Sequence, residues 1–574
     1  MQERQKLLLL SLVTGVCSGL AAVLLVYVTG RVKDAVQLLD SGEGFGFLLY
    51  LLPGVGMLLS ALFVKYVIRD NIGHGVTKVL YAVSRNDSRI KPHNMWSSVV
   101  ASSVTIGLGG SVGAEAPIVY TGAAIGSNLG RAAGLSYKNV TLLLGCGAAG
   151  AIAGIFKAPM AGVLFTIEIL LFNASLGNML PMLLSTLSAG VISYVAFGTT
   201  PVFACNLTPF SMANIPFYVL LGAVCALGSL YFLRSTLWLE DKLGRMRSPL
   251  LRWAMCASGL GVLIFLFPML YGEGYSSLTD LLTGGSLQVY NESAFSWMLN
   301  SGWGIPLFFL VVFLVKVVAM TFTNAGGGVG GTFGPTLFAG AVLGFVVARC
   351  INMVGGSVPE QNFVLVGMAG LMAGVMQAPM TAIFLIAEIS GGYQLMLPLI
   401  ITATISFMVM RIFEDYSIYS KRIAQSGDLL THDNDQAVLT LLKVSDVIKD
   451  KYPRVHPEDS LRTISSIFKQ SSAALFAVVD SDGKLEGVVD IDKIHHFFSQ
   501  TAKYDSIHVY NLMDTDVTVI ESDEKMESVM RKFESTGAWR LPVVDAQGHY
   551  LGCVSNTRIL MAYRDQIRAI APQD

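Results

Sequence analysis

The chain has 574 residues, of which 53% are apolar and only 14% are charged, and its mean hydropathy is +0.58. Soluble domains carry about 25% charged residues, so this composition excludes a soluble enzyme and indicates an integral membrane protein. The net charge of -1 without any basic run excludes a nucleic-acid-binding or disordered chain. Seven cysteines without paired spacing support neither a disulfide framework nor a zinc site.

The first apolar segment begins almost at the N-terminus. Residues 7–29 carry no charge and are long enough to cross a hydrocarbon core of about 30 Å. We interpret them as a first membrane helix with the N-terminus inside. A cleaved signal peptide is the alternative, but it needs a shorter apolar core and an A-x-A-like cleavage site.

Ten further apolar segments follow between residues 47 and 412. Several are too short for a full span, and many are interrupted by Gly or Pro. Helices that stop inside a membrane are typical of transporters, in which the helix ends point at a binding site. The pattern therefore predicts broken helices.

Charged residues become frequent after about residue 426. Residues 444–498 and 509–563 share one order of features: an apolar strand ends in Val-Val-Asp, turns at Asp-Gly or Gln-Gly, and returns as a second strand before a helix. This order predicts an α/β module in two copies, 444–500 and 507–566, joined to the membrane part by a linker at 426–443.

The membrane part contains an internal repeat. Residues 147–169 and 367–389 align without gaps and share ten of 23 residues, including Ala-Pro-Met and the pair Glu168 and Glu388. Upstream, residues 109–126 match a stretch that starts at 326, with Pro117 on Pro335. Convergence of Gly/Ala-rich sequence would not also keep Pro, Met and Glu in order. Two related halves, roughly 1–200 and 215–425, follow from the match.

The repeated segments are typical helix starts, because a Gly-rich turn precedes a Pro in the first helical turn. The free N–H groups and the positive dipole end of such a start face whatever lies ahead. Four starts, two per half, can converge near the bilayer midplane and form an anion site without buried cations. Such a site would bind a small anion weakly enough to release it.

These segments resemble the CLC family of chloride channels and transporters over nearly the whole chain, and the C-terminal pair resembles cystathionine-β-synthase (CBS) repeats. The family motifs are found here, in order, as Gly73-His74-Gly75-Val76-Thr77, with Thr77 in place of the usual Pro, Gly113-Ala114-Glu115-Ala116-Pro117, residues 154–165, and Gly331-Thr332-Phe333-Gly334-Pro335. The resemblance implies an all-α membrane domain of two inverted repeats over 1–425, followed by an α/β CBS pair. It also implies a homodimer with one anion pathway in each subunit.

By its position, Glu115 corresponds to the family's gating glutamate, whose carboxylate competes with the permeating anion and moves away when it is protonated. A lone carboxylate at a helix start inside an apolar segment is costly and usually functional. The alternative is an acid at an exposed turn, stabilised by the helix dipole. Phe333 is its counterpart in the second half and is apolar, so only one half carries the gate.

The resemblance places the anion against the backbone amides of Thr332 and Phe333 and against two hydroxyl groups. The first hydroxyl belongs to a Ser in the family, but this chain has His74, ahead of Gly75 and Val76. An imidazole could donate an N–H, or the ring could point into a vestibule or pack against a helix. Fluoride exchangers carry Met there, which argues against fluoride. Tyr419 is the best match for the second hydroxyl, and Tyr416 is the rival.

Proton exchangers of the family carry an inner glutamate directly after the position of Glu168. Here that position is Ile169, which cannot carry a proton, so the proton-coupled interpretation is weakened, although water or Glu168 could serve. Glu168 and Glu388 are expected to cap or bridge helices. Lys316 is either the counterpart of a recurring family lysine or a snorkelling end charge. Three other acids are expected to be solvated: Asp280, Glu414 and Asp415.

The CBS pair could bind an adenine nucleotide between its repeats. Family members that do so place a ribose-holding Asp before the Ile that opens the last helix, whereas this chain has Lys493 before Ile494 and Arg558 before Ile559. The ribose ligand is therefore missing, and we favour a structural or dimerising module. The sequence predicts no other cofactor and no metal.

The resulting prediction is a chloride-selective transporter, with nitrate and bromide as further anions and with protons acting at Glu115. Its mode is channel-like or weakly coupled, and a chloride/proton antiporter is the alternative. A CBS-based membrane sensor without ion flux is a hypothesis from another class. A hydrolase is not supported, because the chain has no Ser/His/Asp set and no HExxH. We expect a multi-pass homodimer in a prokaryotic plasma (inner) membrane with the CBS pair in the cytoplasm, and no nucleic-acid partner.

Overall fold

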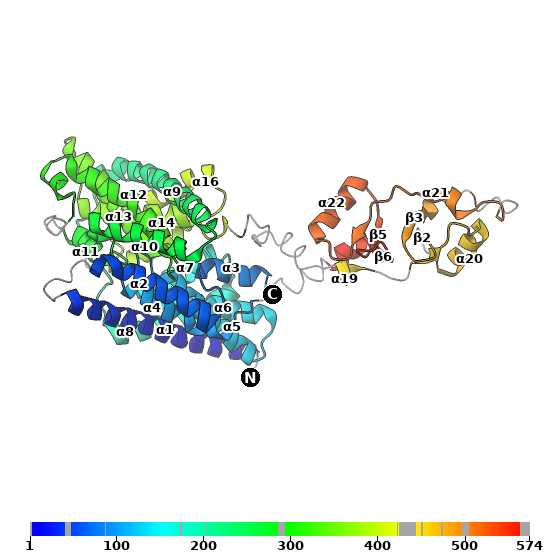
Figure 1. The fold of residues 1–574 in the computed structure, drawn as a ribbon, viewed down its shortest axis with the longest axis horizontal. Helices are drawn as coiled ribbons and strands as arrows, with labels where there is room; N and C mark the ends of the chain where they lie inside the picture. The colour runs from blue at the N-terminus through cyan, green and yellow to red at the C-terminus, as the bar shows by residue number, and fades with distance from the viewer. Residues whose placement is uncertain are drawn as a thin grey trace. The chain divides into compact units, whose positions relative to one another are not determined.

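The computed structural model describes residues 3–40, 48–85, 88–172, 175–203, 205–284, 293–421, 423, 444–448, 452–471, 475–495, 497 and 504–562. The chain divides into two compact units, Met1–Leu429 and Leu430–Asp574 (Figure 1). The predicted linker at 426–443 lies outside the described residues. The two units are taken in turn below.

The first unit is built from helices (Figure 1). They are α1 (Glu3–Asp40), α2 (Leu48–Leu62), α3 (Gly75–Arg85), α4 (Ser97–Gly107), α5 (Glu115–Ala132), α6 (Tyr137–Phe156), α7 (Pro159–Glu168), α8 (Leu176–Phe197), α9 (Ile215–Gly244), α10 (Pro249–Leu266), α11 (Tyr275–Thr283), α12 (Gly304–Ala325), α13 (Phe333–Met353), α14 (Glu360–Met376), α15 (Pro379–Ile389) and α16 (Met396–Phe413). Among the described residues, nine helical segments are long and apolar enough to cross a membrane, and α4, α7, α14 and α15 are shorter apolar helices. The predicted all-α membrane domain with broken helices is confirmed.

The two halves of this unit pack in the same way. In the first half α6 contacts α1, α5 and α8, and in the second half α14 contacts α9, α13 and α16. Glycines lie where the helices cross. A Cβ atom added to Gly340 on α13 would lie 2.6 Å from the carbonyl oxygen of Gly367 on α14, and one added to Gly122 on α5 would collide with that of Gly147 on α6. The backbones therefore touch directly in both halves, which is typical of tight helix packing in membranes.

Helices α7 and α15 show that the halves are inverted. The Glu388 carboxylate, near the end of α15, accepts hydrogen bonds from the amides of Met160 (3.1 Å) and Ala161 (2.9 Å) at the start of α7. Reciprocally, the carboxylate of Glu168, at the end of α7, accepts from the amides of Met380 (3.0 Å) and Thr381 (2.7 Å) at the start of α15. Each helix ends where the other begins, so the two run antiparallel. The expectation that both glutamates cap helices is confirmed.

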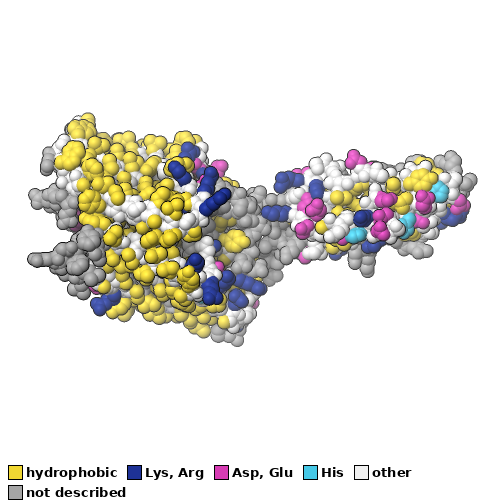
Figure 2. Space-filling view, viewed as in Figure 1, with side chains coloured by type: hydrophobic (Ala, Val, Ile, Leu, Met, Phe, Trp, Pro, Cys, Tyr) yellow, Lys and Arg dark blue, Asp and Glu magenta, His cyan; other side chains and the backbone are white. Residues whose placement is uncertain are grey.

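The outer face of the helical unit is apolar. In Figure 2 hydrophobic side chains dominate the visible face of this unit. Large apolar residues on several helices are exposed, among them Leu20 on α1, Val195 on α8 and Leu227 on α9. Contiguous exposed apolar surface of this extent is unfavourable in water and fits contact with lipid chains.

The second unit contains two three-stranded sheets of one topology. The first is formed by β1 (Arg454–Val455), β2 (Leu475–Val479) and β3 (Leu485–Asp490), and the second by β4 (Ile520–Glu521), β5 (Arg540–Val544) and β6 (Tyr550–Ser555). In each sheet the middle strand pairs in parallel with the first strand and antiparallel with the last. A bulge lies at the equivalent Val-Val step of both middle strands. The helices of this unit include α19 (Val444–Val447), α20 (Leu461–Ser471), α21 (Ile491–Ile494) and α22 (Met526–Thr536). The predicted α/β pair is confirmed.

The hydrophobic cores of this unit do not follow the sequence repeats. Val444 and Val447, which open the first repeat, are buried in the core of the second sheet with Ile520 and Val543. Val509, which opens the second repeat, is buried in the core of the first sheet. The opening segment of each repeat therefore packs into the core of the other repeat's sheet, which ties the two copies together.

Candidate anion-binding site

The starts of α5 and α13 are joined by a two-residue backbone bridge. The amide of Gly113 donates to the carbonyl of Gly331 (3.0 Å), and the amide of Gly331 donates to the carbonyl of Gly113 (2.7 Å). The helices begin two residues later, at Glu115 and Phe333, with Pro117 and Pro335 in their first turns. Two helix N-termini from the two halves are thus held side by side, as the repeat predicts.

The other two predicted starts do not contribute to this site. The first-turn amides of α7 are bonded to Glu388 and those of α15 to Glu168. The expectation of four converging starts is therefore wrong for α7 and α15. A carboxylate already accepts hydrogen bonds from these amides and stabilises the positive ends of the two helix dipoles. These helix starts are therefore not available to bind a mobile anion.

A third helix start takes their place. Gly75 opens α3, and a Cβ atom added to it would collide with the carbonyl oxygen of Ala116 on α5, so α3 and α5 meet closely. His74 precedes Gly75 in a left-handed conformation (φ 55°), and Val76 is buried in the core. His is one of the residues that adopts this conformation more often than most. The first motif is thereby brought to the second.

A small pocket lies between these helix starts. Its lining combines residues of three motifs with a segment that follows α16: His74, Thr77, Ala116, Gly330, Gly331, Thr332, Ile418 and Tyr419. The Thr332 hydroxyl donates to the Tyr419 hydroxyl oxygen at 3.2 Å. Tyr419 is 5% exposed, whereas Tyr416 is 40% exposed. Of the two candidate tyrosines, Tyr419 is thus the one that lies at the pocket.

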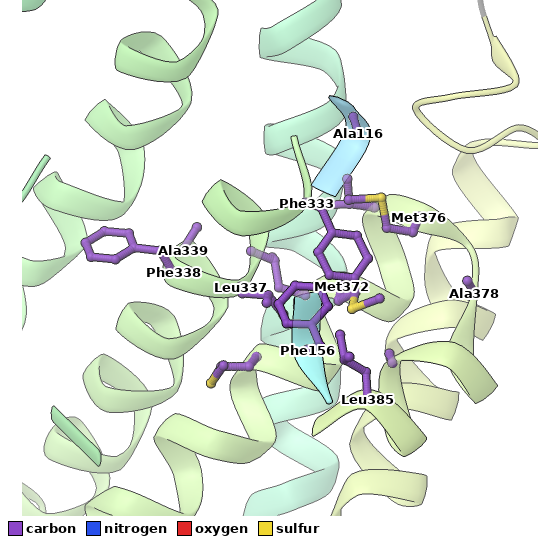
Figure 3. Close-up of a cluster of buried hydrophobic side chains, with 14 of the residues drawn as sticks. Ala116, Phe156, Phe333, Leu337, Phe338, Ala339, Met372, Met376, Ala378 and Leu385 are labelled. Atoms are coloured by element: carbon purple, nitrogen blue, oxygen red, sulfur yellow. The ribbon is translucent and has the colours of Figure 1, made fainter. Parts of the chain in front are cut away.

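The apolar wall beside this site comes from aromatic rings. The Phe333 side chain is buried, and its ring lies 5.5 Å from that of Phe156 on α6 and 6.3 Å from that of Phe165 on α7, measured between centroids. Figure 3 shows the rings of Phe333 and Phe156 next to each other among Met372, Met376 and Leu385, and the two ring planes are tilted by 33°. Phe333 therefore turns its side chain into the core and leaves its backbone amide at the helix start.

Glu115 is 1% exposed and lies on the start of α13. Its Oε2 accepts a hydrogen bond from the Gly334 amide (3.2 Å), and its Oε1 accepts one from the Tyr275 hydroxyl (2.7 Å). Glycines make the space for it: a Cβ atom added to Gly113 would collide with Oε2, and one added to Gly334 would lie 3.1 Å from Oε1. We call this position the Glu115 slot. Ala114, the residue before the helix, and Ala116 flank it with small side chains.

Neither Tyr275 nor its neighbour Glu273 was predicted from the sequence as a site residue. A signal was present, since an acid lies between Gly272 and Gly274 directly before a helix in a chain that has few charges. Glu273 forms an ion pair with Lys33 on α1 (3.0 Å). Glu273 lies in the loop before α11 and Tyr275 is the first residue of that helix, and only the tertiary structure brings this segment to α5.

Lys316 on α12 is fully buried, so the snorkelling interpretation is wrong. Its ammonium group donates to the Ser111 hydroxyl (2.8 Å) and to the Gly272 carbonyl (3.2 Å), and it lies 4.8 Å from the centroid of the Phe338 ring. These partners replace the water that a buried cation loses. Lys316 thereby connects the loop before α5 to the loop before α11.

The remaining expectations concern residues away from the pocket. Ile169 is buried directly after α7. Glu414 was expected to be solvated, which is wrong: its side chain is 10% exposed and pairs with Arg234 (2.8 Å) and Lys421. Asp280 is half-buried and Asp415 is exposed.

In the CBS pair Arg558 is exposed, whereas the side chain of Lys493 is outside the described residues. Within the described ranges, no group of three or more His, Cys, Asp or Glu residues could hold a metal ion.

Inverted helical halves whose N-termini meet at a small pocket are typical of membrane transporters for anions. The family model for the voltage gated chloride channel matches residues 56–411, and the CBS domain model matches residues 444–499 and 509–565. The chain therefore belongs to the CLC family of chloride channels and transporters. It is an integral multi-pass membrane protein of anion transport that carries a C-terminal CBS pair.

Named relatives include both channels and exchangers. A putative chloride channel protein, ClcB-like, of Ralstonia nicotianae is 28% identical over 386 residues, which cover 66% of this chain and 86% of the relative. The H+/Cl- exchange transporter ClcA of Cronobacter sakazakii is 26% identical over 444 residues, which cover 73% and 90%. The match to chloride channel protein CLC-e of Arabidopsis thaliana is 28% identical and spans 61% of this chain but only half of the relative.

Two solved structures share the fold. A slow cyanobacterial Cl-/H+ antiporter has a TM-score of 0.61 at 20% identity and covers 73% of this chain and 97% of its own. A eukaryotic CLC transporter has a TM-score of 0.60 at 18% identity and covers 96% of this chain and 98% of its own. At these identities the likeness concerns the fold alone.

Proposed function

We propose that this protein transports chloride selectively through a CLC-type pathway that Glu115 gates, with one pathway in each subunit of a homodimer. The observation that carries the proposal is the Glu115 slot, in which a carboxylate occupies the start of α13 beside a pocket of polar groups. A carboxylate at that position occupies the place of an anion, because a helix N-terminus stabilises negative charge. Release of the slot would therefore open the same place to chloride.

The physical sequence of events follows from charge. Burial disfavours a charged carboxylate, and protonation removes its attraction to the Gly334 amide. The neutral side chain then leaves the slot, and chloride binds between the amides of Thr332 and Phe333, the Tyr419 hydroxyl and the His74 ring. None of the described residues that line the pocket is Lys or Arg, so the anion is held by dipoles and leaves readily. Nitrate and bromide are further anions for the same groups.

We propose a channel-like or weakly coupled mode. Ile169 carries no proton, and both oxygens of the preceding Glu168 are engaged by amides of α15. A chloride/proton antiporter is the alternative, and relatives named as H+/Cl- exchange transporters favour it. The sharpest difference between the two modes is whether a chloride gradient moves protons uphill.

For its location, we propose a prokaryotic plasma (inner) membrane with the CBS pair in the cytoplasm. The CBS pair is proposed as a structural or dimerising module, because its copies share each other's cores. Adenine nucleotide is not favoured, since the exposed Arg558 stands where a ribose-holding Asp is expected. A sensor without ion flux is the competing function, and it predicts ligand binding in the absence of transport.

The test is chloride flux from proteoliposomes of the purified full chain, recorded together with the pH of the medium. We expect chloride efflux that rises as the pH falls and that drives no uphill proton movement. Glu115→Gln carries no charge at any pH, so we expect it to conduct and to lose its pH dependence.

The matched control is Glu360→Gln on α14, which loses a charge that pairs with Arg349 at 2.9 Å, and it should keep the wild-type profile. Absence of flux under every gradient and pH would overturn the transport proposal. Uphill proton movement driven by chloride would overturn the channel-like mode in favour of the antiporter.

A further inference from the structure

The ring of Tyr275 is held firmly at the start of α11. It meets the ring of Phe203 edge to face, with 5.3 Å between centroids and 81° between planes. Phe203 is buried, and its amide donates to the carbonyl of Ile389 at the end of α15 (3.1 Å). The preceding Gly274 has φ 82°, and a Cβ atom added to it would lie 2.6 Å from the Phe338 ring. Only glycine therefore allows this loop to deliver Tyr275 to its position.

The hydroxyl of Tyr275 completes the Glu115 slot. It donates to Oε1 at 2.7 Å, while the Gly334 amide donates to Oε2 at 3.2 Å. A Cβ atom added to Gly334 would lie 3.1 Å from both Oε1 and the Tyr275 hydroxyl, so the tyrosine reaches the carboxylate across a glycine. The hydrogen bond is a side-chain contribution from a helix that the four family motifs do not include.

We propose that Tyr275 is a positioning residue that holds Glu115 in its slot and sets the pH at which the anion pathway opens. The inference rests on the proposed function, because it assumes that release of Glu115 opens the pathway. A hydroxyl donor stabilises a carboxylate more strongly than a neutral carboxyl group. Tyr275 therefore opposes the protonation that frees the slot, and its removal makes opening easier.

The other charged and titratable groups around Glu115 are compatible with this role. Glu273, from the same loop as Tyr275, acts on Glu115 through its like charge and is paired with Lys33. Tyr419, in the segment after α16, interacts electrostatically with Glu115. His74, directly before α3, lines the same pocket as Tyr419. Lys316 is linked to the loop before α5 through Ser111. Among the described residues of other helices, the Tyr275 hydroxyl and the Gly334 amide donate hydrogen bonds to the Glu115 carboxylate oxygens.

Tyr275→Phe tests the inference, because it removes the hydroxyl and keeps the ring against Phe203. The readout is the pH profile of chloride flux in proteoliposomes. A hydrogen bond that favours the charged form about ten-fold corresponds to a shift of about one pH unit. We expect the midpoint of activation to move by about that amount to higher pH, with up to about ten-fold more flux above the wild-type midpoint.

Two further variants make the result specific. Tyr231→Phe also deletes one hydroxyl from the membrane unit, which donates to the Leu314 carbonyl at 2.9 Å, and it should leave the profile unchanged. Phe203→Leu loosens the support of the Tyr275 ring but keeps the hydroxyl, and we expect a smaller shift in the same direction. This variant also tests the inference if Tyr275→Phe does not fold.

The outcomes separate the inference from the function on which it rests. Wild-type protein without chloride flux overturns the proposed function. A wild type that transports, with a Tyr275→Phe or Phe203→Leu profile that does not move, overturns the inference alone. In a Glu115→Gln background, Tyr275→Phe should have no further effect, and a persisting shift would overturn the claim that Tyr275 acts through Glu115.

Discussion

The starts of α5 and α13 have the same backbone conformation but carry different side chains. Ala114 (φ -82°, ψ -11°) and Thr332 (φ -89°, ψ -10°) precede the two helices with nearly identical dihedral angles. The next residue is Glu115 in one half and Phe333 in the other. Glu115 turns toward α13 and Tyr275, whereas Phe333 turns into an aromatic core. Of these two equivalent positions, only the one on α5 carries a titratable side chain.

The two halves share the contacts that hold their helices together. Glu168 and Glu388 cap each other's helices, and glycines lie at both crossings of α5 with α6 and α13 with α14. Every helix start needs partners for its amides, and every close crossing needs small residues, whatever the protein transports. The two halves therefore differ at the positions of Glu115 and Phe333 and agree in the features that hold them together.

The largest expected effect comes from breaking the glycine crossings. A Cβ atom at Gly126 would collide with the Leu143 carbonyl, and one at Gly344 with the Phe363 carbonyl. We expect Gly126→Val and Gly344→Val each to cost about 3 kcal/mol or more, because backbone cannot yield as a side chain can. The measurement is the yield of monodisperse protein by size-exclusion chromatography. If one half tolerated valine and the other did not, the crossings would not be equivalent.

The reciprocal caps should come next in size. Glu168→Gln and Glu388→Gln each keep one oxygen acceptor and lose the charge at a helix N-terminus, at a cost of about 1–2 kcal/mol. The Glu168 variant should lose slightly more, because its carboxylate also accepts from the Thr381 hydroxyl (2.7 Å). Thermal unfolding in detergent measures both. A cost in only one of the two variants would contradict a symmetric role.

The CBS copies allow a smaller version of the same test. Gly483 (φ 83°) and Gly548 (φ 87°) occupy equivalent turns, and a Cβ atom at either would meet open space. Alanine at these positions destabilises the fold only because it must adopt a left-handed backbone conformation, which costs about 1 kcal/mol. We expect Gly483→Ala and Gly548→Ala to lower the unfolding temperature of the full chain equally and to leave chloride flux unchanged.

The smallest expected effect concerns the anion pocket. Tyr419→Phe removes a hydroxyl that is hydrogen-bonded to Thr332, and we expect the preference for chloride over nitrate to change about three-fold, which is less than about 1 kcal/mol. Tyr416→Phe, at an exposed position, is the control and should change nothing. Competition between the two anions in the flux assay is the measurement. An effect of Tyr416 equal to that of Tyr419 would contradict the assignment.

Much of this molecule could be predicted from residue order. The offsets of 218 and 220 between matching motifs predict equivalent helices, because covalent spacing fixes which segments can correspond. Capping by Glu168 and Glu388 also follows from the repeat, since an acid in the last two residues of a helix must find hydrogen-bond donors in an apolar medium. The two strand-turn-strand copies follow from alternation and turn residues.

The sequence by itself thus determined the membrane class, the two halves, the CBS pair and the position of Glu115. Only the tertiary structure decided which helix starts meet. In the tertiary structure, carboxylates cap the starts of α7 and α15, and α3 lies against α5. Lys316 is buried, and the opening segment of each CBS copy packs into the core of the other. The tertiary structure also delivered Tyr275 to Glu115 from 160 residues away. The physical reason is that hydrogen-bond partners in a membrane protein are chosen by proximity across the fold, which local sequence patterns do not encode.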